Sequence, residues 1–223
     1  GCTAVDASTV LITHLSEIIR RYAHELVSRQ TVKEMLQMVK QSCPAVVEEL
    51  VPDLLNLGEI QKVIQNLLQE RIPVHDLVTI LEELADQARV TKDIDMLTEL
   101  VRQALRRTIT RQYASPEKSL SVISLDPELE NEMANSLKNT SKGIMPVLNP
   151  LKFRQLIANL GELLEALERK GSASPVILTS PGIRLPFRRL VEGYFPQVAV
   201  LSVSEILPEI KVESAGVIKV NED

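Results

Sequence analysis

The sequence predicts an α+β protein, in which a helical subdomain, residues 1–115, is followed by a small α/β subdomain with a mixed sheet, residues 116–223. Two observations predict this class. Apolar residues recur every three or four positions through the first part, which is typical of amphipathic helices. After Ser115-Pro116, short apolar runs alternate with helical segments, which is typical of strands joined by helices. The change near Ser115 is therefore predicted to be a subdomain boundary.

Six helical segments are predicted in the first part. The first, from Ser8 to about Ser28, is expected to bury one face. That face carries six residues: Leu11, Leu15, Ile18, Ile19, Tyr22 and Leu26. Thr31 and Glu34 have the spacing of a capping box, which predicts the start of the second helix, and Pro44 predicts its end. The remaining segments are 45–51, 57–70, 74–88 and 93–112.

The last of these segments has a charge order that suits one continuous helix. Asp93 and Asp95 fall in its first turn, and the arginines Arg106, Arg107 and Arg111 fall near its end. This order complements the helix dipole. The same arginines are candidates for pairing with acidic groups of a neighbouring subunit. Both interpretations stay open at this point.

The second part alternates strands and helices. Asp126-Pro127 has the form of a helix cap followed by a proline in the first turn. The predicted order is strand 120–125, helix 127–137, loop 139–149, helix 150–170, strand 176–178, helix 185–194, strand 198–201 and an edge strand or hairpin over 209–220.

Composition describes a globular protein with an aliphatic core. Hydrophobic residues make up 44% of the chain and aromatic residues only 3%, and the net charge is −5. This charge argues against a nucleic-acid backbone as the main partner.

Cys2 and Cys43 lack metal-site spacing, so we expect reduced cysteines in the cytosol. No apolar stretch approaches the roughly 18 residues needed to cross a bilayer. The chain begins with Gly1 and not with Met, and a helical pattern follows almost at once. We therefore expect this chain to be part of a longer protein.

Motifs for catalysis, cofactor binding and metal binding are not found in the sequence. His14 and His24 are ten residues apart, about 15 Å along a helix, so they do not share a metal. We therefore expect no enzyme activity, no cofactor and no metal.

A second basic cluster follows the predicted strand at 176–178. Ser180-Pro181-Gly182 leads into Arg184, Arg188 and Arg189. A helix N-terminus behind a strand is a potential anion site. Because these arginines lie within the predicted helix and not at its start, a solvated or partner-facing helix is the favoured interpretation.

Runs of residues over nearly the whole chain match one known protein family. They include THLSEIIRR (13–21), KVIQNLL (62–68), IPVHDL (72–77) and ALRRTI (104–109), with 176–180, 183–190 and 196–201 in the second part. On these residues the chain resembles the LcrD/FHIPEP family, the large export-gate subunits of bacterial type III secretion. His24 and Arg29-Gln30 favour the flagellar branch over the injectisome branch.

The resemblance implies a location and a task. Family members have an N-terminal membrane part and a cytosolic part of four subdomains, on the cytoplasmic side of the inner membrane. Residues 1–115 and 116–223 match the third and fourth subdomains. The family forms a ring, taken to be a nonamer, that receives export substrates, chaperones and components of the ATPase complex. Ring contacts involve the helical subdomain, so Arg106 and Arg107 are the candidate subunit-interface residues.

Three other hypotheses remain. The first is an injectisome homologue of the same family. The second is a winged-helix-like nucleic-acid-binding protein, which the acidic charge opposes. The third is a small-molecule-binding α/β enzyme, which requires a pocket near Ser180 and Gly182.

Overall fold

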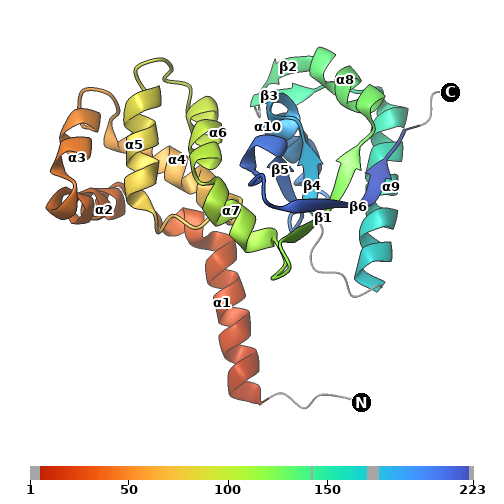
Figure 1. The fold of residues 1–223 in the computed structure, drawn as a ribbon, viewed down its shortest axis with the longest axis horizontal. Coiled ribbons are helices and arrows are strands. Elements are labelled where there is room, and N and C mark those ends of the chain that lie inside the picture. Colours follow the sequence, from red (N-terminus) through yellow and green to blue (C-terminus); the bar gives the residue numbers. More distant parts are fainter. Residues whose placement is uncertain (1–5, 142, 170–175, 221–223) are drawn as a thin grey trace. The chain divides into compact units, whose positions relative to one another are not determined.

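The computed structural model describes residues 6–141, 143–169 and 176–220. The chain divides into two compact units, residues 1–108 and residues 109–223. The first unit is helical, and the second combines helices with a parallel sheet (Figure 1). The predicted α+β class is confirmed.

The helical unit is built around α4, which contacts α1, α2 and α6. One face of α4 is fully buried through Ile60, Val63, Ile64 and Leu67, as its apolar spacing predicts. The helices of this unit are α1 (Ala7–Leu26), α2 (Arg29–Ser42), α3 (Pro44–Leu50), α4 (Leu57–Gln69), α5 (Leu77–Gln87) and α6 (Ile94–Ala104).

Two predicted helix boundaries in the first part are wrong. The N-cap of α2 is Ser28, whose Oγ accepts the N–H of Thr31 at 3.1 Å, so the helix begins before the predicted capping box. The predicted helix 93–112 is two helices, because Leu105 ends α6 and α7 (Arg106–Tyr113) follows. The apolar spacing continues through this break, since Leu105 and Ile109 are both buried, so the pattern did not reveal it.

The α/β unit contains a four-stranded parallel sheet of order β5-β4-β1-β6. Its strands are β1 (Ser119–Leu125), β4 (Val176–Thr179), β5 (Ala199–Ser202) and β6 (Lys211–Ile218). Antiparallel pairing occurs in a separate hairpin of β2 (Leu137–Thr140) and β3 (Gly143–Pro146). The prediction of a loop over 139–149 is therefore wrong where β2 and β3 form this hairpin. The turn residue Gly143 has φ +93°, a conformation that favours glycine.

Three helices share one core with this sheet: α8 (Pro127–Asn135), α9 (Pro150–Arg169) and α10 (Pro181–Val191). Met133, Leu160, Ile177 and Phe187 are completely buried in that core. Asp126 caps α8 as predicted, since its Oδ1 accepts the N–H of Glu128 at 3.0 Å. A short 3₁₀ turn, η1 (Val203–Glu205), follows β5 before the chain crosses to β6 at the sheet edge.

Candidate functional site

Reactive side chains do not gather into a site in the part of the chain that the structure describes. Over residues 6–141, 143–169 and 176–220, no group of three or more His, Cys, Asp or Glu is placed to hold a metal ion. Cys43 is a free thiol, and Cys2 lies outside the described residues. Among the described helices, none has the length and apolar character needed to cross a membrane.

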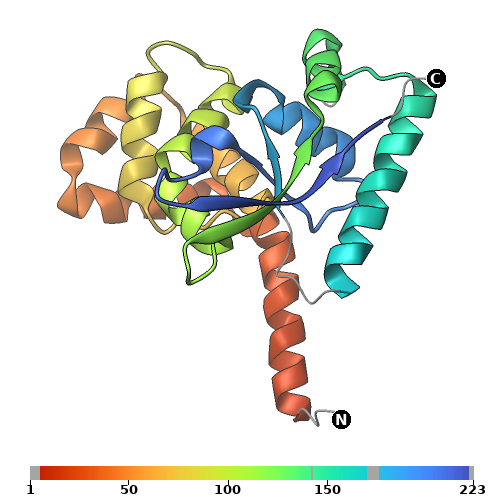
Figure 2. The ribbon, with the colours of Figure 1, turned by 45° about the vertical axis from the view of Figure 1, so that its right-hand side comes forward.

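The most distinctive surface is the apolar face of α1. Eight large apolar side chains on this helix are between 40% and 67% exposed. They are Val10, Leu11, Ile12, Leu15, Ile18, Ile19, Tyr22 and Leu26. The prediction that α1 buries this face is wrong. Within the described part of the helical unit, only the C-terminal end of α1 lies against the other helices and its N-terminal part projects away from them (Figures 1 and 2), and these side chains stay exposed.

The C-terminal end of α1 is firmly held by α4 and the turn after it. Gln61 and Gln65 on α4 both donate to the carbonyl oxygen of Val27, at 2.8 and 3.1 Å. Arg71 Nη2 donates to Glu17 Oε1 at 2.7 Å. Because Val27 is the C-cap residue, the glutamines satisfy a carbonyl group that the helix itself leaves unpaired. The exposed face of α1 is thus presented by an anchored helix.

Arg106 and Arg107 lie on the surface where α6 ends and α7 begins. They follow the C-terminus of α6, where cations are favourable, and open α7, where cations are unfavourable. The two helix ends therefore act in opposite directions on these two charges, and the dipole interpretation, which assumed one helix, does not explain them. Only Arg111 lies in the last turn of α7. Among the described residues, neither Arg106 nor Arg107 forms an ion pair.

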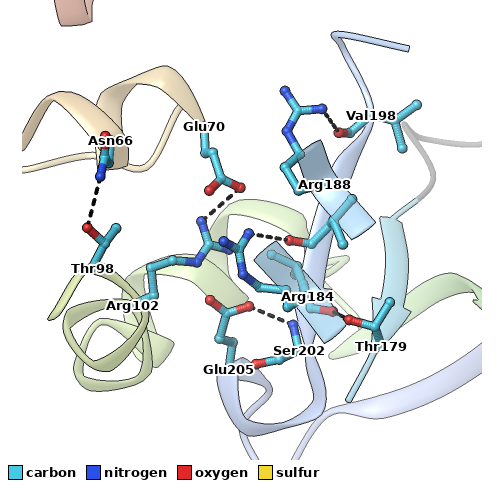
Figure 3. Close-up of polar contacts among 12 residues, drawn as sticks. Asn66, Glu70, Thr98, Arg102, Thr179, Arg184, Arg188, Val198, Ser202 and Glu205 are labelled. Atoms are coloured by element: carbon cyan, nitrogen blue, oxygen red, sulfur yellow. Dashed lines mark hydrogen bonds and ion pairs between the residues drawn. The ribbon is translucent and has the colours of Figure 1, made fainter. Parts of the chain in front are cut away.

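The arginines of α10 have a different environment from the predicted one. Arg184 is completely buried and Arg188 is 7% exposed, so the interpretation of a solvated or partner-facing helix is wrong for both. Arg184 Nη1 donates to the carbonyl oxygen of Val200 at 3.3 Å. Arg188 donates to the carbonyl oxygens of Phe195 and Pro196 at 3.5 and 3.2 Å, and to that of Val198 at 3.2 Å, the contact drawn in Figure 3. Arg188 thus stabilises the chain that connects α10 to β5, and Arg184 binds β5 itself.

The N-terminus of α10 is likewise occupied from within the unit. Glu130 Oε1 on α8 accepts the N–H of Ser180, the N-cap residue, at 2.6 Å. A carboxylate at this position satisfies an unpaired amide and interacts favourably with the helix dipole. The potential anion site near Ser180 and Gly182 is therefore filled by a side chain of the protein itself.

Comparison with known proteins assigns the chain to a family. The model of the FHIPEP family matches residues 1–211. The chain belongs to the FHIPEP family. The resemblance predicted from the sequence runs is thereby confirmed.

The curated relatives of this FHIPEP chain include flagellar biosynthesis proteins FlhA. The Bacillus subtilis protein is 37% identical over 220 residues, which is 99% of this chain and 32% of that protein. The Escherichia coli protein is 39% identical over 206 residues, which is 92% of this chain and 29% of that protein. The chain therefore spans about a third of the length of the relatives it matches.

Solved structures share the fold of the FHIPEP chain. Nonameric SctV-C of EPEC, determined by cryo-EM, superposes with a TM-score of 0.82 and 30% identity, covering 92% of this chain and 61% of that one. The Chlamydia pneumoniae CdsV protein, in a complex with CdsO, superposes with a TM-score of 0.85 and 32% identity, covering 96% and 63%. The solved relatives thus contain residues beyond those that this chain matches.

Proposed function

We propose that the chain is part of a cytosolic docking platform of a flagellar type III protein export gate. The observation that carries the proposal is the exposed apolar face of α1, in a chain that spans about a third of its relatives. Soluble proteins rarely leave such a contiguous apolar face uncovered. An exposed apolar face of this kind marks a protein–protein interaction surface. Residues 1–115 and 116–223 are then the third and fourth cytosolic subdomains.

The platform lies on the cytoplasmic side of the inner membrane and is anchored through the part absent from this chain. Its partners are export substrates, their chaperones and components of the ATPase complex. The nonameric SctV-C structure and the CdsV–CdsO complex support ring assembly and protein binding for this family. The role requires no catalysis, cofactor or nucleic acid.

A pair of substitutions on α1 tests the docking proposal in the full-length protein. Leu15→Ser with Ile19→Ser removes two exposed apolar side chains, 54% and 50% exposed. We expect loss of swimming and of flagellar proteins released into the medium, at normal protein abundance. The matched control is Met38→Ser with Met96→Ser, which removes apolar side chains of similar exposure elsewhere in the helical unit. Normal swimming of the α1 variant would contradict the proposal.

The ring contact is proposed to include Arg106 and Arg107. Both are exposed, and neither has an ion-pair partner within the described residues, so both charges are available to a neighbouring subunit. Reversing them, Arg106→Glu with Arg107→Glu, is expected to prevent ring assembly and reduce export. Like charges then face each other across the interface, and such a juxtaposition costs several kcal/mol.

A charge-matched control separates this effect from a general change in surface charge. Lys138→Glu with Arg154→Glu alters the net charge equally at exposed positions of the α/β unit. Ring assembly is measured by negative-stain microscopy of the purified full-length protein, and export by released flagellar protein. If the Arg106 and Arg107 variant assembled rings as well as the control, these residues would not be part of the interface.

A further inference from the structure

The outer edge of β6 is a row of strand backbone without a neighbour among the described residues. β6 pairs on one side with β1 and ends the sheet order β5-β4-β1-β6. The N–H of Lys211 donates to Lys118 and the carbonyl of Ile218 accepts from Asp126, both at 2.9 Å on the β1 side. Because backbone groups of successive strand residues point to opposite edges, those of Val217 point outward. An unpaired edge of this kind accepts another extended chain.

The two halves of this edge differ in their protection. Lys211 and Glu213 lie in the first half, where Nζ and Oε1 are 2.8 Å apart. The hydrogen bond to Glu213, together with its negative charge, raises the pKa of Lys211. Charged side chains of this kind oppose strand addition. A bulge follows, opposite Val122 and Ile123, and the second half, 214–218, carries no charge.

An open groove of about 400 Å³ adjoins the uncharged half, between α9 and β6. Its lining residues are Asn159, Glu162, Leu163, Val217 and Lys219. α9 approaches closely here because β6 has a glycine: a Cβ on Gly216 would lie 2.9 Å from Leu163 Cδ2. Figure 2 shows the end of β6 running up to α9. The groove therefore lies beside the strand edge and is lined by two aliphatic residues, Leu163 and Val217, together with three polar or charged ones.

The charges of the groove indicate the chemistry of its occupant. Glu162 supplies one carboxylate and Lys219 one ammonium group, and neither has an ion-pair partner in the described part of the chain. Asn159 Nδ2 donates to the carbonyl oxygen of Lys219 at 2.6 Å, which holds the end of the strand. An occupant that complements this lining carries an aliphatic side chain, a cation and an anion on one face.

We infer that the outer edge of β6 at residues 214–218 binds an extended segment of another protein by strand addition. Backbone hydrogen bonds to the edge supply affinity, and an aliphatic side chain in the groove, with an oppositely charged pair beside it, supplies selectivity. This inference stands apart from the α1 face and from the ring contact. It can fail while the docking platform proposal holds.

The test uses a fluorescein-labelled, capped peptide of about ten residues that alternates valine with threonine. One lysine and one glutamate flank the valines on the valine face. Fluorescence anisotropy against the purified chain is expected to give saturable binding. N-methylation of the amides on one edge of the peptide weakens binding at least about tenfold, whereas N-methylation of the opposite edge leaves it unchanged, since only one edge pairs with β6.

Val217→Pro supplies the matching change in the protein, because proline lacks the outward N–H and is tolerated at a sheet edge. It is expected to weaken peptide binding at least about tenfold, with unchanged circular dichroism. If both N-methylated peptides bind like the parent, or if the parent peptide does not saturate, strand addition is wrong, whatever Val217→Pro does to folding. A dimer of the chain alone that Val217→Pro abolishes would mean that the edge takes a second copy, which also overturns the inference.

Discussion

The helices α1 and α10 show that the polarity of a side chain does not by itself decide whether the side chain is buried. The apolar residues of α1 are exposed in this chain, whereas two arginines of α10 are buried. Apolar spacing on α1 specifies a face that favours burial, but burial requires a packing partner, and within the described helical unit this face stays exposed. On α10, the Arg188 guanidinium is buried because three backbone carbonyls replace its lost water. Burial is therefore decided by available partners.

The largest change in stability is expected when the buried Arg188 side chain is replaced. Arg188→Met keeps a long apolar stem but removes the donor of the Pro196 and Val198 carbonyls, whereas the Phe195 carbonyl still accepts the Val198 N–H. We expect the free energy of unfolding to fall by about 3 kcal/mol, since hydrogen bonds to charged groups contribute about 1.5–3 kcal/mol. Urea denaturation followed by circular dichroism measures it. Arg154→Met, at an exposed position on α9, is the control and is expected to change stability by less than about 0.5 kcal/mol. Equal stability of both variants would refute the role of Arg188.

A smaller effect is expected at the start of α10. Glu130→Ala removes the carboxylate that accepts the Ser180 N–H, which leaves the N-cap amide unpaired. Loss of this hydrogen bond to a charged group and of the favourable interaction with the helix dipole is expected to cost about 1 kcal/mol. The same urea titration measures the change, with Glu128→Ala as a control. Because Glu128 also lies in the first turn of α8, the control changes the charge of that turn equally. A cost of Glu130→Ala no larger than that of Glu128→Ala would rule out the capping role.

The smallest effect is expected on α1 in the isolated chain. Leu15→Ser with Ile19→Ser exchanges side chains that are already half exposed. Surface substitutions of this kind change stability by about 0.5 kcal/mol or less. The contrast is Leu67→Ala on α4, a fully buried position, where about 2–5 kcal/mol is expected. A large loss of stability from the α1 pair would show that the apolar face of α1 is covered within this chain, which would contradict the comparison.

Local sequence patterns predicted most elements because their causes are local. Asp126 was recognised as a cap and accepts the amide hydrogen bond expected of it, whereas Asp93, predicted within a first turn, is the N-cap of α6. The break at Leu105 was missed because apolar spacing continues across it. The hairpin of β2 and β3 was missed because it is short, and its strands carry few buried residues. Neither feature has a strong signal within its own residues.

For the candidate surfaces too, some features were predictable from the sequence and others required the structure. Sequence runs sufficed to indicate the FHIPEP family, and Arg106 and Arg107 were recognisable as a basic pair. Their position between two helices, and hence the loss of the dipole explanation, required the structure. The groove beside β6 was not predictable, because Gly216 and Leu163 are 53 positions apart and meet only when α9 packs on the sheet.

By itself, the sequence determined the class of the fold, the cap of α8, the amphipathic character of each helix and the family. These properties depend on neighbouring residues or on inherited runs of sequence. Only the tertiary structure decided which amphipathic face is left uncovered, which arginines are buried and that β6 pairs with β1 at its inner edge. Those outcomes depend on contacts between residues distant in the chain, since burial and pairing require partners that folding alone brings together.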